Sequence, residues 1–353
     1  MAEHQKNVLI LFSSSEIGGA ERSIGNMALE NSNQSINYKI ATFGSTGPLS
    51  NWIKSKSLDC ICFNKKISIL LRFIYSNRPD VIYVIGFKLS FLLRFYCKIF
   101  TKILLVQGVR WNPSSNSKLD KCFRFFERFF SFLMDGYIVN SNSAKELLLS
   151  LSIKKVELIY NGISNINNYK KKSVQKEYVT TVANLSLRKG HFEYLKVIEN
   201  VIEEFPDTIF LFIGYDNLNG KVQKLIKKKS LSSNVKYIGF KENIGDYLAK
   251  SKFFVLPSLY GEGCPTSILE AFKYKLPVIA YEIDGIPEIV ENDFDGILVN
   301  QINKNSLENA IKDLLKDPAK IKIMGERGYE KLKKNYVLKN MLEKHNSFFL
   351  NLS

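Results

Sequence analysis

Residues 253–280 read FFVLPSLYGEGCPTSILEAFKYKLPVIA. The apolar run 253–256 predicts a buried strand, and Gly261 and Gly263 flank the turn that follows it. Pro265 and Thr266 suit the first turn of a helix, and the run 278–280 predicts the next strand. This stretch therefore predicts a strand, helix, strand unit of a parallel α/β sheet.

The same alternation of strands and helices extends over the whole chain, interrupted only by the polar, Asn-rich stretch 164–176. We predict two Rossmann-like, doubly wound domains, 1–168 and 177–335, followed by a helix, 336–353, that packs back toward the first domain. Open sheets of this kind bind ligands at their carboxyl ends, so we expect the domains to face one another across a cleft that holds the active site. The predicted strands are 8–12, 38–43, 81–85, 103–106, 137–139, 156–159, 178–182, 209–213, 235–238, 253–256, 278–280 and 296–299.

Composition limits the classes of function. The 353 residues are 45% hydrophobic and 24% charged, as in folded proteins, and suffice for two domains. The net charge of +16 suits nucleic acid, anionic lipid or phosphorylated molecules, but no nucleic-acid recognition motif accompanies it. We therefore predict no nucleic-acid partner.

Five cysteines match no zinc-site spacing, and no apolar run is long enough to span a bilayer. Residues 1–6 are polar and do not resemble a secretory leader. These features predict a cytoplasmic protein without a metal site.

Two glutamates on the opening stretch carry the candidate chemistry. The start of the predicted helix offers N–H groups and a dipole that attract a pyrophosphate. Ile268, Leu269 and Phe272 form its apolar face, whereas Glu270 lies off that face, where it can accept hydrogen bonds from ribose hydroxyls. Glu262, on the turn, would point at the group attached beyond the phosphates. For an arbitrary pair of glutamates, a solvated surface would be the better interpretation.

The flanking residues favour a ligand site, because the stretch resembles the Glu-x7-Glu signature of the retaining glycosyltransferases of family 4. That resemblance implies the GT-B fold, with a nucleotide-sugar donor held mainly by the second domain. It implies that Glu270 binds the ribose and that Glu262 lies beside the donor sugar. The backbone of Gly263, Cys264, Pro265 and Thr266 would hold sugar hydroxyls and phosphate. Such enzymes transfer with retention, without a metal and with no cofactor besides the donor substrate.

Two further places match the family. Lys189 and Gly190 follow the first strand of the second domain, where the family places a basic residue that can neutralise charge on the departing diphosphate. The family commonly has Arg five residues earlier, and here that residue is Asn184, so stabilisation of the diphosphate is expected either to be shared with Arg188 or to be weaker. In the first domain, Gly18 and Gly19 resemble the loop that lines the cleft opposite the donor.

Other residues depart from the family. Many members carry a His after the strand 103–106, where this chain has Gln107. Gln107 and Arg110 remain candidates for polar contacts to the sugar or acceptor. The motif Asp293-Phe-Asp295 has the spelling of a metal-binding Asp-x-Asp site, but its position predicts a solvated turn.

Basic and aromatic residues in the first domain raise a membrane interpretation. Arg94, Lys98 and Lys102 recur every four residues and predict a basic helix face beside an apolar one. In 121–134, Cys122, Phe126, Phe129 and Leu133 form the expected core stripe, and Phe125 and Phe132 fall outside it. Core packing is favoured for most of the aromatics, whereas a basic, partly apolar patch would suit a peripheral enzyme acting on a lipid-linked sugar.

The leading hypothesis is a glycosyltransferase that acts on a glycan acceptor in surface polysaccharide biosynthesis. The alternative is an inactive GT-B subunit that serves as a binding or chaperone partner of another glycosyltransferase. The sequence does not identify the donor base, the donor sugar or the acceptor.

Overall fold

The computed structural model describes residues 5–115, 117–164, 166, 178–303 and 305–352. The chain divides into two compact units: Met1–Ser164 together with Leu338–Ser353, and Asn165–Val337. Of the predicted linker 164–176, all but Ser164 and Ile166 lie outside the described residues.

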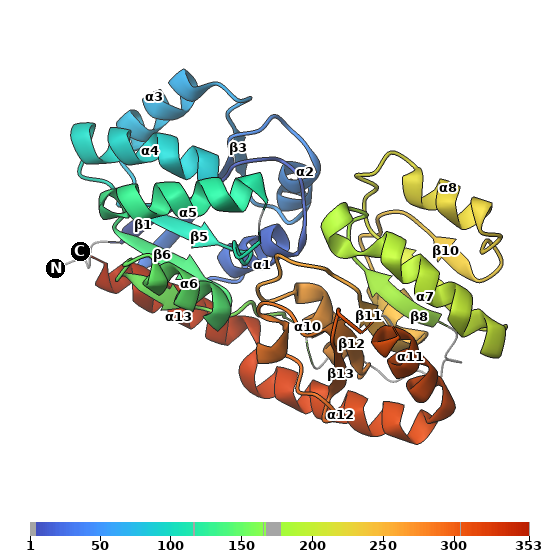
Figure 1. The fold of residues 1–353 in the computed structure, drawn as a ribbon. Helices are drawn as coiled ribbons and strands as arrows, with labels where there is room; N and C mark the ends of the chain where they lie inside the picture. The colour runs from blue at the N-terminus through green and yellow to red at the C-terminus, as the bar shows by residue number, and fades with distance from the viewer. Residues whose placement is uncertain (1–4, 116, 165, 167–177, 304, 353) are drawn as a thin grey trace. The chain divides into compact units, whose positions relative to one another are not determined.

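The first unit is built on a seven-stranded sheet of order β3-β2-β1-β4-β5-β6-β7, in which every pairing is parallel (Figure 1). The predicted strands are present, and the structure adds the short β3, which the sequence did not reveal. The strands are β1 Lys6–Phe12, β2 Ile36–Thr42, β3 Cys60–Cys62, β4 Val81–Ile85, β5 Leu104–Val109, β6 Gly136–Val139 and β7 Val156–Leu158. The helices are α1 Gly19–Leu29, α2 Pro48–Ser55, α3 Ile67–Asn77, α4 Phe87–Phe100, α5 Lys118–Phe130, η1 Ser131–Leu133, α6 Asn142–Ser150 and α13 Leu338–Asn351.

The second unit is built on a six-stranded parallel sheet of order β10-β9-β8-β11-β12-β13. Its strands are β8 Tyr178–Val182, β9 Ile209–Ile213, β10 Val235–Tyr237, β11 Ser251–Leu256, β12 Val278–Tyr281 and β13 Gly296–Val299. Its helices are η3 Leu187–Lys189, α7 His191–Glu204, α8 Lys221–Lys228, α9 Gly245–Ala249, α10 Thr266–Lys273, η4 Ile286–Glu288, α11 Ser306–Lys316 and α12 Pro318–Asn335. Both units therefore have the predicted α/β, Rossmann-like architecture.

Burial in β4 shows how helices cover both faces of the first sheet. All five residues of this strand are buried, as expected of a central parallel strand. Successive side chains point to opposite faces. Ile82 and Val84 pack in one core with Leu93 of α4, whereas the Tyr83 ring lies 5.4 Å from the ring of Phe349 on α13.

Two expectations about the aromatic helices were wrong. Arg94 does not belong to a basic surface face: it is wholly buried and forms an ion pair with Glu127 of α5 at 2.5 Å. On α5 the buried residues are Asp120, Phe123 and Glu127, whereas Cys122 is exposed and Phe129 is 55% exposed. The buried side of α5 therefore includes two carboxylates that have partners inside the unit. Among the described residues, no helix has the length and hydropathy needed to cross a bilayer.

Candidate active site

Strand order brings the two candidate segments of the second unit together. The chain leaves β8 toward β9 on one side and later returns to β11 on the other, so β8 and β11 mark the point where the strand order reverses. Ligands of doubly wound sheets bind outside the carboxyl ends of the strands at this point. The loops after the two strands are directly joined there, because the N–H of Leu259 donates to the carbonyl oxygen of Arg188 at 2.7 Å.

Gly190 permits this close approach. Its φ of +67° lies in the left-handed region, and a Cβ at this position would come within 2.0 Å of the carbonyl oxygen of Pro257. Only glycine meets both requirements without displacing the backbone. The Lys189-Gly190 pair therefore places the lysine against the loop that carries Glu262.

Glu262 is buried and paired with two cations. Its Oε1 atom accepts a hydrogen bond from Nζ of Lys189 and lies 3.5 Å from Nη1 of Arg188, which also donates to the carbonyl oxygen of Gly261 at 3.1 Å. Burial alone would raise the pKa of Glu262, but Lys189 and Arg188 outweigh it and hold the pKa below its usual value. The structure thus brings together Glu262, Lys189 and Arg188, three of the predicted site residues.

Asp284 positions the turn that carries Glu262, and the sequence analysis missed it. Its Oδ2 atom accepts from the N–H groups of Gly261 at 2.6 Å and Glu262 at 3.1 Å. The N–H of Gly285 in turn donates to the carbonyl oxygen of Glu262 at 3.1 Å. An Asp-Gly pair just after a predicted strand is a turn signal, but nothing in the sequence shows which backbone groups the aspartate binds.

The predicted strand, turn, helix junction is present. Pro265 was expected in the first turn of α10 but is its N-cap, so the helix begins one residue later, at Thr266, and no described side chain makes a capping hydrogen bond to it. Gly263, Cys264 and Pro265 are buried, and Thr266 is half-buried. The fully buried Ile268, Leu269 and Phe272 anchor the helix, while Glu270 is half-buried and lies off that face as predicted. The junction can therefore present the start of a helix to an anionic group.

The remaining predicted site residues occupy other places. The Oδ1 atom of Asn184 accepts from the N–H of Tyr215 at 3.0 Å, which ties the end of β8 to the end of β9. Gly18 and Gly19 belong to the first unit, where Gly18 is the N-cap of α1 after β1.

Gln107 and Arg110 are engaged within the first unit. Gln107 is wholly buried, and its Oε1 atom accepts from Ser90 at 2.6 Å and from Arg94 at 2.7 Å. Gln107 is therefore a core residue, and its candidacy for ligand contacts was wrong. Nη2 of Arg110 donates to the hydroxyl of Tyr83 at 2.7 Å and lies 3.0 Å from Nε2 of His345, so Arg110 helps to hold α13.

The Asp293-Phe-Asp295 motif is only partly the solvated turn that was expected. Asp293 is exposed, but Asp295 is wholly buried, pairs with Lys331 and accepts from the N–H of Glu291 at 2.9 Å. Asp295 therefore secures this turn to α12. Among the described residues, no group of three or more His, Cys, Asp or Glu side chains is arranged to hold a metal ion.

Comparison with known proteins agrees with the fold. Over 339 residues, covering 87% of both chains, this chain is 22% identical to the Escherichia coli UDP-Gal:alpha-D-GlcNAc-diphosphoundecaprenol alpha-1,3-galactosyltransferase. It is 27% identical to the Staphylococcus aureus capsular polysaccharide biosynthesis glycosyltransferase CapH over 325 residues, covering 87% of this chain and 90% of CapH. Anabaena HepE, solved with UDP and glucose, superposes with a TM-score of 0.86 at 18% identity, covering 99% of this chain and 100% of HepE.

Two family models match consecutive parts of the chain. The model described as Glycosyltransferase Family 4 matches residues 17–165, and that described as Glycosyl transferases group 1 matches residues 163–331. Together they extend over both units, which have the sheets and helices of GT-B structures such as HepE. The chain belongs to the group 1, family 4 glycosyltransferases of GT-B fold.

Proposed function

We propose that this glycosyltransferase moves a hexosyl group, with retention and without a metal ion, from a nucleotide-diphosphate sugar to a hydroxyl of a lipid-linked glycan. The observation that carries the proposal is the buried Glu262 held by Lys189 and Arg188 at the strand-order reversal of the second unit. The names of the E. coli and S. aureus relatives, which specify a diphosphoundecaprenol-linked acceptor and capsular polysaccharide, support this acceptor class. The enzyme would work peripherally at the inner face of the membrane in surface polysaccharide biosynthesis.

In the proposed site, different residues bind different parts of the donor. The diphosphate lies at the start of α10, where Lys189 and Arg188 neutralise its charge. Glu270 accepts from the ribose hydroxyls, and Glu262 lies beside the transferred sugar. These assignments follow the family signature, and the contacts of Lys189 and Arg188 with Glu262 support them.

The proposed reaction breaks the bond between the anomeric carbon and the phosphate oxygen, and the electron pair leaves with the nucleoside diphosphate. The acceptor hydroxyl attacks the same face of the sugar within the resulting ion pair, which retains the anomeric configuration. Its proton passes to the departing phosphate oxygen. Lys189 and the helix start stabilise the negative charge that develops on that oxygen.

A thermal-shift screen with UDP-, GDP- and ADP-sugars tests the donor proposal. A donor at a hundred times its dissociation constant should add about 2.7 kcal/mol to the free energy of unfolding. We expect Lys189→Ala to abolish this shift and lower turnover about 10²-fold or more. Lys224→Ala, which removes an exposed lysine of α8, is the matched control and should behave as wild type.

Turnover decides between the enzyme and the inactive subunit. Nuclear magnetic resonance of the product should show the anomeric configuration of the donor. Absence of turnover with every nucleotide sugar, with Glu262→Ala indistinguishable from wild type in donor binding, would instead support the inactive subunit.

A further inference from the structure

Helices α4 and α5 of the first unit pack against one another through aromatic rings. The ring of Phe91 on α4 lies 4.7 Å from that of Phe126 and 5.5 Å from that of Phe130, both on α5. Because the two helices are in contact, their solvent-exposed sides adjoin, and we call the combined surface the α4–α5 face. Its exposed residues, including those that follow each helix, are Lys88, Leu92, Phe95, Lys98, Ile99, Phe100, Lys102, Lys118, Leu119, Lys121, Cys122, Phe125, Arg128, Phe129 and Phe132.

The apolar side chains of the α4–α5 face are unusually exposed for their size. Phe132 is 72%, Phe100 71% and Ile99 66% exposed, and Phe125 is 58% exposed. On α4 the outward residues follow helical spacing, so the apolar positions form one continuous stripe between lysines. Contiguous exposed apolar patches mark sites of interaction with proteins or membranes.

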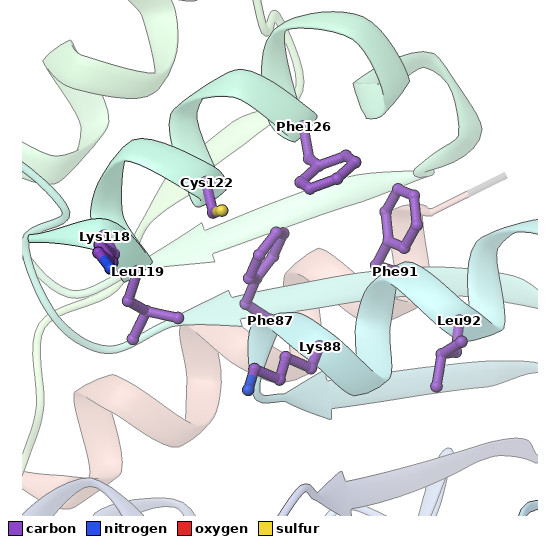
Figure 2. A pocket seen from close by; sticks show the side chains of 8 residues that line it. All are labelled: Phe87, Lys88, Phe91, Leu92, Lys118, Leu119, Cys122 and Phe126. Carbon is purple, nitrogen blue, oxygen red and sulfur yellow. The ribbon is translucent and has the colours of Figure 1, made fainter.

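A pocket of about 530 Å³ lies between the two helices. Figure 2 shows Phe87 and Phe91 of α4 and Phe126 of α5 lining it, with Lys88 and Lys118 at its edge. These two lysines belong to the first turns of α4 and α5. The pocket is therefore an apolar space of ligand size with ammonium groups at its rim.

The charge of the α4–α5 face is predominantly positive. From Phe87 to Met134 the chain contains two carboxylates, Asp120 and Glu127, and both are buried. The exposed cations of the face are Lys88, Lys98, Lys102, Lys118, Lys121 and Arg128, and Lys98 lies 3.4 Å from the carboxylate of Asp135, which follows the 3-10 helix η1. Any partner of this face must therefore offer apolar groups and negative charge together.

We propose that the α4–α5 face docks on an anionic lipid bilayer. Phe125, Phe132 and their apolar neighbours enter the boundary between headgroups and acyl chains, and the surrounding lysines pair with lipid phosphates. An acyl chain enters the pocket while Lys88 and Lys118 contact its phosphate. Exposed aromatic rings mixed with cations favour a bilayer, because its boundary region accepts rings and its phosphates accept cations. An acidic protein would pair with the cations but would leave the rings without an apolar partner. The inference extends the proposed function, because it supplies the surface at which a lipid-linked acceptor is met.

Co-sedimentation of the full chain with phosphatidylcholine vesicles, with and without phosphatidylglycerol, tests the inference. Wild type should bind the vesicles that contain phosphatidylglycerol, and this binding should weaken at high salt. Phe125→Ser with Phe132→Ser should weaken binding about tenfold. Lys118→Glu with Lys121→Glu should remove the preference for phosphatidylglycerol while keeping the melting temperature of wild type.

Matched controls lie on the second unit. Ile302→Ser removes an apolar side chain that is 89% exposed, and Lys224→Glu with Lys227→Glu reverses two exposed charges of α8. Both controls should bind vesicles as wild type does. An equal loss of vesicle binding in the control variants would mean that net charge or non-specific hydrophobic adsorption, rather than the α4–α5 face, causes the binding.

An assay with a water-soluble acceptor separates this inference from the proposed function. Variants of the α4–α5 face should keep wild-type turnover of that acceptor while they lose vesicle binding. Turnover by a wild-type protein that binds no vesicles would overturn the inference and the proposed membrane location, and would leave the proposed sugar transfer standing. Vesicle binding without turnover of any donor would support the inference and contradict the proposed sugar transfer. Capture of an acidic protein by this face, without vesicle binding, would also overturn the inference.

Discussion

Gly190 illustrates how one residue determines the geometry of the candidate site. It combines a left-handed backbone with a contact that leaves no room for a side chain, because the carbonyl oxygen of Pro257 occupies the place of a Cβ. A larger residue would have to push the Lys189 turn away from the loop after β11. The separation would also pull Lys189 from Glu262.

We expect Gly190→Ala to be much more costly than Gly220→Ala. Both glycines have a left-handed φ, but a Cβ at Gly220 meets no atom within 4 Å. Gly220→Ala should therefore lose only the conformational cost of about 1–2 kcal/mol. Gly190→Ala should lose roughly 2 kcal/mol more, and donor affinity with it. Urea unfolding of the two variants measures the difference, and equal losses would show that the Pro257 contact is unimportant.

The charge of Glu262 predicts a dependence of stability on pH. Its pKa is lower in the folded protein than its usual value near 4.5, so its pairing stabilises the fold above that value. As the pH falls below about 4.5, protonation removes this contribution. Urea unfolding of Glu262→Gln across this range should show a shallower decline than wild type.

Glu330→Gln is the control for this experiment, because Glu330 pairs with Lys333 on the exposed side of α12 in the same unit. Exposed pairs contribute little to stability. This variant should therefore keep the wild-type slope. A wild-type slope in Glu262→Gln would contradict the proposed role of the buried pair.

At the scale of elements, α4 and α5 are joined by a buried ion pair as well as by aromatic rings. Arg94 and Glu127 have no exposed side-chain surface, and Arg94 also donates to Gln107 on β5. The hydroxyl of Tyr137 on β6 donates to Glu127. Two helices and two strands therefore share one polar network inside an apolar core.

Breaking one side of this network should be worse than removing both charges. Glu127→Leu leaves the Arg94 guanidinium buried without its carboxylate and should cost about 3–5 kcal/mol. Arg94→Leu combined with Glu127→Leu should cost clearly less than the sum of the two single variants. A double-mutant cycle by urea unfolding measures this coupling, and strict additivity would refute it.

Sequence patterns predicted the elements far better than the contacts between them. Long apolar runs such as β11 identified the strands, whereas β3 was missed because its Cys-Ile-Cys residues lack the run of β-branched and aromatic side chains that favours a strand. The spacing of Arg94, Lys98 and Lys102 suggested a basic surface face. The burial of Arg94 could not be predicted from this spacing, because its partner Glu127 lies 33 residues away on another helix. A buried charge looks like a surface charge until its partner is known.

For the candidate site too, the sequence predicted which residues take part better than it predicted their contacts. The family signature identified Glu262 and Glu270, and the strand order explains why Lys189 lies beside Glu262. Asp284 was missed because its role is to accept hydrogen bonds from backbone N–H groups, which any residue could provide. Gln107 was misjudged because a polar residue after an apolar run resembles a ligand contact, even when the sheet buries it.

At the scale of the whole molecule, α13 completes the first unit although it follows the second unit in the chain. Phe349 is wholly buried against Tyr83 and Tyr38. The hydroxyl of Tyr38 donates to Oδ1 of Asn346 at 2.6 Å. The core of the first unit thus depends on residues from both ends of the described chain.

We expect Phe349→Ala to destabilise the first unit by about 3–5 kcal/mol. Leu350→Ala, at the next position, is the control, because Leu350 is 41% exposed and should change stability little. Thermal unfolding followed with and without a nucleotide sugar measures both effects. The donor-induced shift should survive in Phe349→Ala, since the candidate donor site belongs to the second unit; its loss would contradict that assignment.

The placement of α13 also has a consequence for biosynthesis. A ribosome delivers the sheet of the first unit early, but the helix that covers Tyr83 emerges only after the whole second unit has been made. Until then the face of β4 that carries Tyr83 lacks Phe349. The second unit, whose segments are contiguous, can complete its core first. The nascent first unit should therefore be the part of the molecule that chaperones must protect.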